Sequence, residues 1–183
     1  MGLGVREALE SDWPAIAEVI LAAFGREEGP EIAGLAAELL QDPTAHPSLA
    51  LVATANGRAV GYLLFTSTRI KDAQQAAPSA ILAPLAVHPD YQGQGLGGRL
   101  IEEGLGQLRA SGVDLVFVLG HPGYYSKFGF SPAGARGFEA PYRIPPENAD
   151  AWMVQELRPG AMGRISGQVV CADALNAPEH WQE

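Results

Sequence analysis

The stretch of the sequence best suited to chemistry is HPDYQGQGLGG, residues 88–98, in which four of the last six residues are glycine. Glycine leaves backbone N–H groups uncovered by side chains, and a helix that begins directly after them adds the positive end of its dipole. N–H groups at a helix N-terminus bind phosphate. The segment therefore predicts a loop that binds a phosphate or pyrophosphate group. The alternative is that the glycines only permit a tight turn and close helix packing.

Two common nucleotide-binding motifs do not fit this stretch. Gly93, Gly95 and Gly98 match the dinucleotide spacing G-x-G-x-x-G, but in that fold the first glycine follows the first strand almost at once. Here five residues separate Val87, the end of the preceding apolar run, from Gly93. The phosphate loop of nucleoside triphosphatases requires Lys-Ser or Lys-Thr after the glycines, and neither follows them. A dinucleotide-binding oxidoreductase is therefore a remote alternative.

Hydrophobic periodicity places the glycine loop between a strand and a helix. SAILAPLAV, residues 79–87, reads as a buried strand and is about half the length that a membrane-spanning helix needs. From Gly95 onward apolar residues recur on one helical face as far as Ser111-Gly112. DLVFVLG, residues 114–120, is a second buried strand. A strand–helix–strand unit of this kind predicts that the two strands are parallel.

The rest of the chain supplies strands and helices to pack around this unit. A short alternating segment near the N-terminus precedes a helix with Ser11 as its N-cap and Pro14 in its first turn. A second helical pattern, 32–40, ends before Asp42-Pro43. Asn56-Gly57 between two apolar runs predicts a β-hairpin. Two further strands are expected at the ranges 151–157 and 166–172. A mixed sheet with helices packed on it follows.

Composition limits the function and the compartment. The 183 residues suit a single domain, 1–183, and the net charge of −9 argues against a nucleic-acid partner and weakly favours an amine-bearing one. Cys171 is the single cysteine, and no export signal or membrane span is recognisable, so we expect a cytoplasmic protein with no membrane partner. We expect no metal, because the histidines stand too far apart for a metal-binding motif: His46, His88, His121 and His180.

The glycine stretch fits a third pattern better, Gln92-x-x-Gly95-x-Gly97, and resembles the pyrophosphate-binding segment of the GNAT superfamily of N-acetyltransferases. In that family the preceding strand ends in an apolar triplet followed by His-Pro-x-Tyr or similar, which Leu85-Ala86-Val87 and HPDY match. A second family motif, Tyr-x-Lys-x-Gly-Phe, is matched by residues 125–130. The resemblance covers roughly residues 4–132.

The resemblance implies a fold, a cosubstrate and a set of site residues. The implied fold is α/β, with a mixed, mostly antiparallel central sheet, a parallel strand pair at the cofactor site and flanking helices. The implied reaction is direct transfer of the acetyl group of acetyl-CoA to a primary amine. Tyr125 matches the tyrosine that protonates the CoA thiolate. The implied cofactor-binding residues are Leu85, Ala86, Val87, Gln92, Gly93, Gln94, Gly95, Leu96, Gly97 and Gly98.

Several points stay open at this stage. Many family members carry an asparagine just after the second strand, whereas this chain has Gly120-His121-Pro122-Gly123, and His121 is a candidate replacement. The general base is open between Glu27, Glu28 and water. The acceptor, a small molecule or a peptide, is unidentified, and a homodimer is open. An alternative function is a non-catalytic acyl-CoA-binding or regulatory module.

Overall fold

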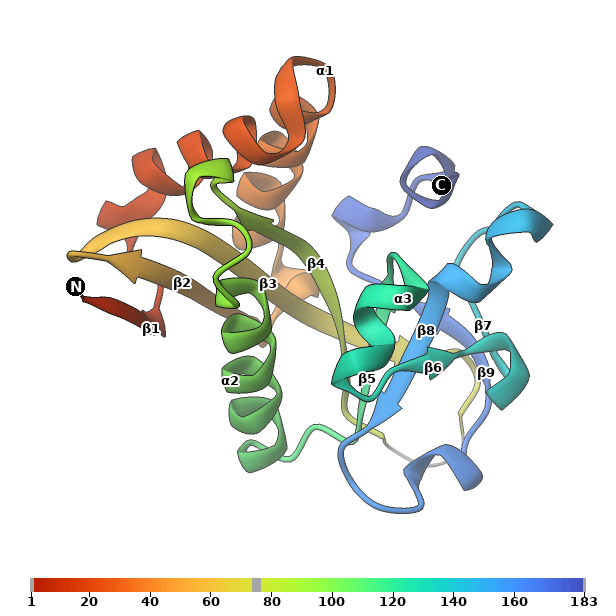
Figure 1. Cartoon of the computed structure of the whole chain (residues 1–183). Helices are drawn as coiled ribbons and strands as arrows, with labels where there is room; N and C mark the ends of the chain where they lie inside the picture. Colours follow the sequence, from red (N-terminus) through yellow and green to blue (C-terminus); the bar gives the residue numbers. More distant parts are fainter. Residues whose placement is uncertain (1, 74–76, 183) are drawn as a thin grey trace.

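One mixed sheet forms the centre of the computed structural model, which describes residues 2–73 and 77–182. Within these residues the strands are β1 (Leu3–Glu7), β2 (Leu49–Ala55), β3 (Arg58–Ile70), β4 (Ser79–Val87), β5 (Leu115–Leu119), β6 (Ser131–Pro132), β7 (Phe138–Glu139), β8 (Trp152–Glu156) and β9 (Gly167–Val170). The helices are α1 (Trp13–Gln41), α2 (Leu96–Ala110) and the short α3 (Pro122–Tyr125). Figure 1 shows α1 and α2 on opposite sides of the sheet.

The strand order is β1-β2-β3-β4-β5-β8-β6, and β9 pairs with both β3 and β7. β4 and β5 are parallel, as are the two-residue β7 and its partner β9, and the other pairs are antiparallel. This arrangement confirms the predicted mixed, mostly antiparallel sheet with a parallel pair beside the glycine loop. The strands expected at 151–157 and 166–172 correspond to β8 and β9.

The predicted hairpin joins β2 to β3. Asn56 and Gly57 both have positive φ, at 52° and 84°, and the strands pair from Ala55 and Arg58 onward. Positive φ at both central residues is the geometry of a type I′ turn, which Asn-Gly adopts readily. The local sequence signal is thus sufficient here, and it places β3 beside β2.

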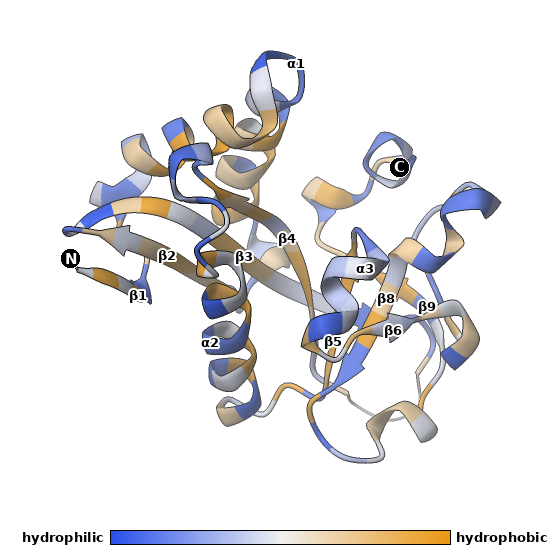
Figure 2. Cartoon of the chain, in the orientation of Figure 1, coloured by the Kyte–Doolittle hydropathy of each residue, from blue (hydrophilic) through white to orange (hydrophobic). Residues whose placement is uncertain are grey.

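Each face of the sheet has its own apolar core. On one face α2 buries the stripe Leu96, Leu100, Ile101, Leu105 and Leu108, which lies in a cluster with Leu63 and Phe65 of β3. On the other face α1 buries Ile16, Val19 and Ile20 in a cluster with the C-terminal Trp152 and Trp181. Figure 2 shows β4 as mostly hydrophobic, whereas α1 and α2 carry both kinds of residue. The helices are therefore amphipathic, and each packs its apolar side on one face of the sheet, so that the sheet is buried on both faces.

α1 differs from the prediction in two ways. Gly25 has φ 86° and ψ −178°, which breaks the helix, and the helical backbone resumes directly after it, several residues before the expected start at 32. Ser11 is not the N-cap, because α1 begins at Trp13 with Asp12 in that position; Pro14 does lie in the first turn. The two halves of α1 pack closely, since a Cβ on Gly29 would lie only 3.0 Å from the Cα of Leu21.

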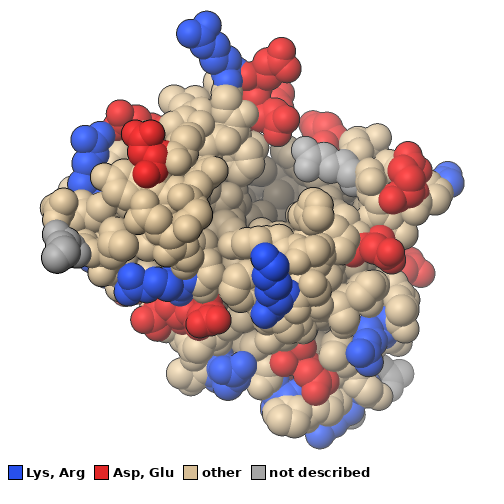
Figure 3. Space-filling model, in the orientation of Figure 1, with Lys and Arg blue, Asp and Glu red and all other residues tan. Residues whose placement is uncertain are grey.

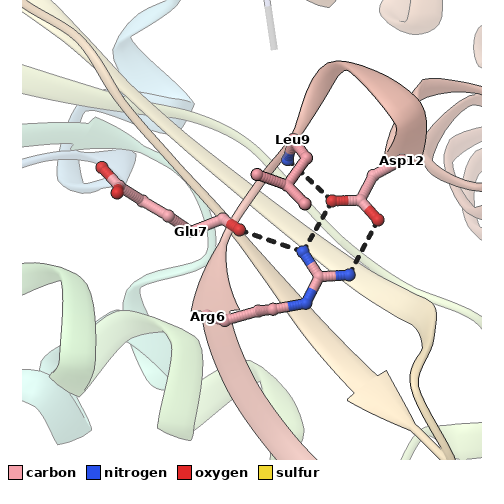
Figure 4. A network of polar contacts seen from close by, with 4 residues as sticks. All are labelled: Arg6, Glu7, Leu9 and Asp12. Carbon is pink, nitrogen blue, oxygen red and sulfur yellow. Dashed lines mark hydrogen bonds and ion pairs between the residues drawn. The ribbon is translucent and has the colours of Figure 1, made fainter.

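An ion pair fixes the junction between β1 and α1 (Figure 4). The Arg6 guanidinium donates to both carboxylate oxygens of Asp12, at 2.7 and 2.8 Å, and the backbone N–H of Leu9 donates to the same carboxylate at 2.7 Å. These hydrogen bonds, with the Arg6 contribution largest, hold the pKa of Asp12 below its usual value. The Asp12 side chain therefore ties the strand to the turn instead of capping the helix.

The C-terminal segment is fastened to the end of α1. The Asp42 carboxylate accepts from the backbone N–H groups of Thr44 and Ala174, and the Thr44 hydroxyl accepts from the N–H of Asp173. The Trp181 indole, buried in the same core, donates to the carbonyl of Leu175 at 3.0 Å. In the described part of the chain no helix is both long and apolar enough to span a membrane.

We predict that Asp12→Asn lowers the unfolding free energy by about 1 to 2 kcal/mol at neutral pH, because hydrogen bonds between charged groups are strong but Arg6 is partly exposed. Since folding lowers the pKa of Asp12, its contribution is complete above the unfolded pKa of about 4 and is lost as the pH falls through the folded value. Urea unfolding at neutral and acidic pH should therefore show a difference that shrinks below about pH 4. Asp150→Asn, at an exposed position, is the control. An equal difference at both pH values would contradict this account.

Candidate active site

The parallel strands β4 and β5 separate at their carboxyl ends. Their pairing runs from Ser79 and Leu115 only as far as Leu82 and Val118, although β4 continues to Val87. The cause is a bulge in β4: the register with β3 shifts there, so that Leu64 faces both Ala83 and Pro84. A bulge of this kind bends a strand and increases its twist. Figure 1 shows β4 diverging from β5 above this point.

The divergence leaves one edge of β4 open. From Leu85 to Val87 the strand still pairs with β3, but on its other edge no strand of the described residues pairs with it. Unpaired backbone N–H and C=O groups are strong hydrogen-bonding groups that need partners. Figure 3 shows that the surface is hollowed at this end of the sheet, between α1 and the C-terminal segment. An extended ligand can therefore lie along β4 as an additional strand would.

A short 3-10 turn, Pro89–Tyr91, connects the open edge to the glycine loop. His88 Nδ1 accepts from the N–H of Asp90 at 3.1 Å, which orients the turn as the histidine–proline pair predicts. The Gln92 side chain donates through Nε2 to the carbonyl of Val87 at 2.9 Å. Gln92 thus ties the loop back to the end of β4. The Gln92 side chain therefore has a structural role, which is separate from any contact that the backbone N–H of Gln92 makes with a ligand.

Gly93 and Gly95 are explained by backbone conformation. Both have φ 77°, in the left-handed region that favours glycine, and a Cβ on either would meet nothing within 4 Å. Gly95 is the N-cap of α2. The N–H groups of Leu96, Gly97 and Gly98 follow in the first turn, where no intrahelical acceptor is available to them. The loop and the first turn therefore present several N–H groups at the positive end of the helix dipole, as an anion-binding site requires.

Gly97 and Gly98 are explained by packing. A Cβ on Gly97 would lie 2.5 Å from the hydroxyl oxygen of Tyr124, and one on Gly98 would lie 3.1 Å from the ring of Phe128. The segment from α3 to Phe128 thus lies directly against the first turn of α2. This role of Tyr124 and Phe128 was not predicted from the sequence. No local sequence pattern reveals these contacts, because Tyr124 and Phe128 are far from Gly97 and Gly98 in the sequence.

Tyr125 is the last residue of α3, and it packs back on the residue that follows β5. Its ring occupies the space where a Cβ on Gly120 would be, and it makes edge contacts with Tyr124 and Phe130 at centroid distances of 5.1 and 5.9 Å. Burial raises the pKa of Tyr125, and Tyr124 adds to this. Among the described residues the Tyr125 hydroxyl has no hydrogen-bond partner. It is therefore a protonated donor that is free for a ligand.

The connection between β5 and α3 is closed by His121. Its Nδ1 accepts from the N–H of Gly123 at 3.2 Å and caps α3. An accepting Nδ1 leaves the proton of the neutral ring on Nε2. The other open candidates, Glu27 and Glu28, lie exposed on α1 just after the break at Gly25. The structure does not bring either of them into hydrogen bonds with the other site residues.

The groups that could hold a metal are dispersed. Within residues 2–73 and 77–182 no cluster of three or more His, Cys, Asp or Glu side chains has the arrangement of a metal site. Cys171 is buried, and burial raises its pKa to about 12. The expectation of a reaction without metal stays a prediction.

Comparisons with known proteins agree on one family. A family model described as an acetyltransferase (GNAT) domain matches residues 4–133. The N-acetyltransferase YjhQ of Escherichia coli K12 is 47% identical over 165 residues, which are 90% of this chain and 89% of that protein. YhbS of Escherichia coli K12, also named an N-acetyltransferase, is 32% identical over 175 residues, covering 94% of this chain and 98% of its own length.

Solved structures resemble the fold over nearly the whole chain. The crystal structure of the GNAT family N-acetyltransferase YhbS from Escherichia coli in complex with CoA has a TM-score of 0.84 at 30% identity, covering 96% of this chain and 92% of that one. A GNAT family acetyltransferase from Brucella melitensis in complex with acetyl-CoA has a TM-score of 0.74 at 27% identity, covering 95% and 98%.

We predict that Gly97→Ala destabilises the protein by about 1 to 3 kcal/mol, the usual cost of overpacking. The new methyl carbon would lie 2.5 Å from the Tyr124 hydroxyl oxygen, and the ring of Tyr124 is held by edge contacts with Tyr125 and Phe128. Tyr124→Phe in the same chain removes that oxygen and should recover most of the loss. Denaturant unfolding of the single and double variants measures this coupling.

The control for this pair lies on the same helix. A Cβ on Gly106 meets nothing within 4 Å, so Gly106→Ala should leave stability unchanged or raise it by up to about 1 kcal/mol. If Gly97→Ala were as stable as Gly106→Ala, α3 would not be packed on the first turn of α2 in the way described.

Proposed function

The chain belongs to the GNAT acetyltransferase family, and on that premise we propose that it transfers the acetyl group of acetyl-CoA directly to a primary amine. The observation that carries the proposal is the open edge of β4, which leads at one end to the glycine loop, while the next strand, β5, is followed by the segment that carries Tyr125. The relatives crystallised with CoA and with acetyl-CoA support the choice of cosubstrate.

In this proposal the backbone holds most of the cosubstrate. The N–H groups of the loop and of the first turn of α2 bind the pyrophosphate, and the open edge of β4 binds the pantetheine arm and the acetyl carbonyl. The residues concerned are Leu85, Ala86, Val87, Gln92, Gly93, Gln94, Gly95, Leu96, Gly97 and Gly98. Leu96 takes part through its N–H alone, since its side chain is buried under α2. Main-chain N–H groups near the acetyl oxygen would stabilise the oxyanion that forms during transfer.

The reaction begins with a neutral amine. An alkylammonium of pKa about 10.4 is neutral to less than about one part in a thousand at pH 7, so a base or a water chain must take up a proton. The amine nitrogen then attacks the thioester carbon, and the C–S bond breaks as the amide forms. The amine loses its second proton to water, and the thiolate gains one to become CoA. No covalent intermediate with the enzyme is needed.

Tyr125 is the group that meets the departing sulfur. Burial keeps its pKa above the ordinary value, so the phenol is protonated throughout the physiological range. The same shift makes full transfer to a thiolate of pKa about 8.5 unfavourable, so the hydroxyl acts mainly as a hydrogen-bond donor while the C–S bond breaks. Water can then supply the proton that completes the thiol.

The acceptor enters through the hollow between α1 and the C-terminal segment. The C-terminal residues share the core of α1 and are bonded to Asp42 and Thr44, which supports one domain over residues 1–183. Glu27, Glu28 and water stay the candidates for the base. The cytoplasmic location and a homodimer also stay predictions.

Thiol release in the presence of acetyl-CoA and a panel of amines, polyamines, amino acids, aminoglycosides and peptides tests the proposal. We expect release that depends on at least one amine, with the acetylated product identified by mass spectrometry. Tight binding of acetyl-CoA without transfer to any acceptor would favour the non-catalytic acyl-CoA-binding module instead.

We predict that Tyr125→Phe lowers kcat by about 100-fold or more, as expected for loss of a positioned donor, with unchanged affinity for CoA. Because burial raises the pKa of Tyr125, no loss of kcat through this group should occur below about pH 10 in the unaltered enzyme. Tyr142→Phe is the control, since its hydroxyl bonds Asn176 in the C-terminal segment. Full activity of Tyr125→Phe would remove Tyr125 from the mechanism.

A further inference from the structure

Lys127 lies beside the glycine loop although it is far from it in sequence. It belongs to the turn Ser126–Phe128 that follows α3. Its Nζ lies 5.7 Å from the centroid of the Tyr124 ring, and the hydroxyl of that ring is packed against Gly97 in the first turn of α2. The next residue, Phe128, is packed against Gly98. The ammonium group therefore lies over a ring that packs against the first turn of α2.

This position is unfavourable for a cation in the absence of an anion. The N-terminus of a helix carries a partial positive charge and favours negative groups. Lys127 is exposed, and among the described residues it forms no ion pair with a carboxylate. The chain has 21 acidic and 12 basic residues, so carboxylates are plentiful elsewhere on the surface. A ligand phosphate next to the loop would supply the missing partner.

Acetyl-CoA carries two phosphate groups of different kinds. The linear pyrophosphate suits the converging N–H groups of the loop, which need a close approach that glycine permits. The 3′-phosphate is a separate monoester on the ribose and carries close to two negative charges at neutral pH. A flexible lysine at the side of the loop, one aromatic ring away from Gly97, suits this second group.

Building on the proposed function, we propose that Lys127 binds the 3′-phosphate and makes the enzyme prefer CoA to 3′-dephospho-CoA. Lys127 is in this view a specificity-determining residue, distinct from Tyr125, which acts on the thioester. The π-face of Tyr124 holds the ammonium group in place before the ligand binds. The same short segment, residues 124–128, then contributes to both ends of the cosubstrate.

The test compares two ligands on three proteins, with binding measured by calorimetry so that no acceptor is needed. We expect the unaltered protein to bind CoA about tenfold or more tighter than 3′-dephospho-CoA, as one charge-assisted contact provides. Lys127→Met keeps the aliphatic stem and should remove this preference by weakening CoA binding alone. Lys71→Met replaces the other lysine of the chain, at the far end of β3, and should keep the preference.

The outcomes separate this proposal from the proposed function. Equal binding of the two ligands by the unaltered protein, or a preference that survives Lys127→Met, would overturn the role of Lys127 while leaving acetyl transfer intact. If the preference for CoA were lost in Arg99→Met and kept in Lys127→Met, the 3′-phosphate would be bound by Arg99, the exposed arginine of α2, and not by Lys127. Failure of both ligands to bind would reject the proposed function and this inference together. In steady-state kinetics Lys127→Met should raise KM for acetyl-CoA with kcat unchanged.

Discussion

The bulge at Ala83 and Pro84 is the constraint on which the rest of the site depends. In a continuous parallel pair, β4 and β5 would satisfy each other's backbone groups to their ends, and no ligand could enter between them. Because Leu64 faces two residues of β4, the strand turns away after Leu82 while still pairing with β3 through Val87. The sheet thus keeps one edge of β4 rigid and frees the other. This rigidity matters because a backbone site can bind selectively only when its groups are held in advance.

A second constraint links the two sides of the opening. The segment after β5 packs into three positions that lack a β-carbon, with Tyr124 on Gly97, Phe128 on Gly98 and Tyr125 on Gly120. Gln155 of β8 holds the same segment by donating to the carbonyl of Phe128 at 2.7 Å. The glycine loop and Tyr125 are therefore positioned by the same packed aromatic rings. A change in this packing would move the two together.

Local signals in the sequence were enough for the elements that carry the loop. Asn56-Gly57 determines its own turn. The apolar residues of 79–87 and 96–108 recur with the spacing of a buried strand and of an amphipathic helix, and each element would bury them in any compact fold. Ser11 is not the cap because the helix begins two residues later, after Asp12. The Asp12 side chain is held by Arg6 and by the N–H of Leu9, and these contacts depend on β1, which the local sequence does not reveal. The break in α1 depends on Gly25 adopting positive φ, which a glycine in a helical pattern permits without requiring. Family motifs pointed to Gly97 and Gly98, but their packing against Tyr124 and Phe128 is visible only in three dimensions.

The overall charge suits the proposed reaction in a way that the site alone does not explain. With a net charge of −9 the protein repels the anionic cosubstrate at long range. In the proposed function, binding therefore relies on short-range donors, namely the N–H groups of the loop and the local cation Lys127. An alkylammonium acceptor is attracted by the same negative field, and acetylation removes its charge. The field then favours the amine over the neutral amide that leaves. The two features thus suit the two substrates of the proposed reaction. Backbone N–H groups suit the anionic acetyl donor, and the negative charge of the protein suits the cationic acceptor.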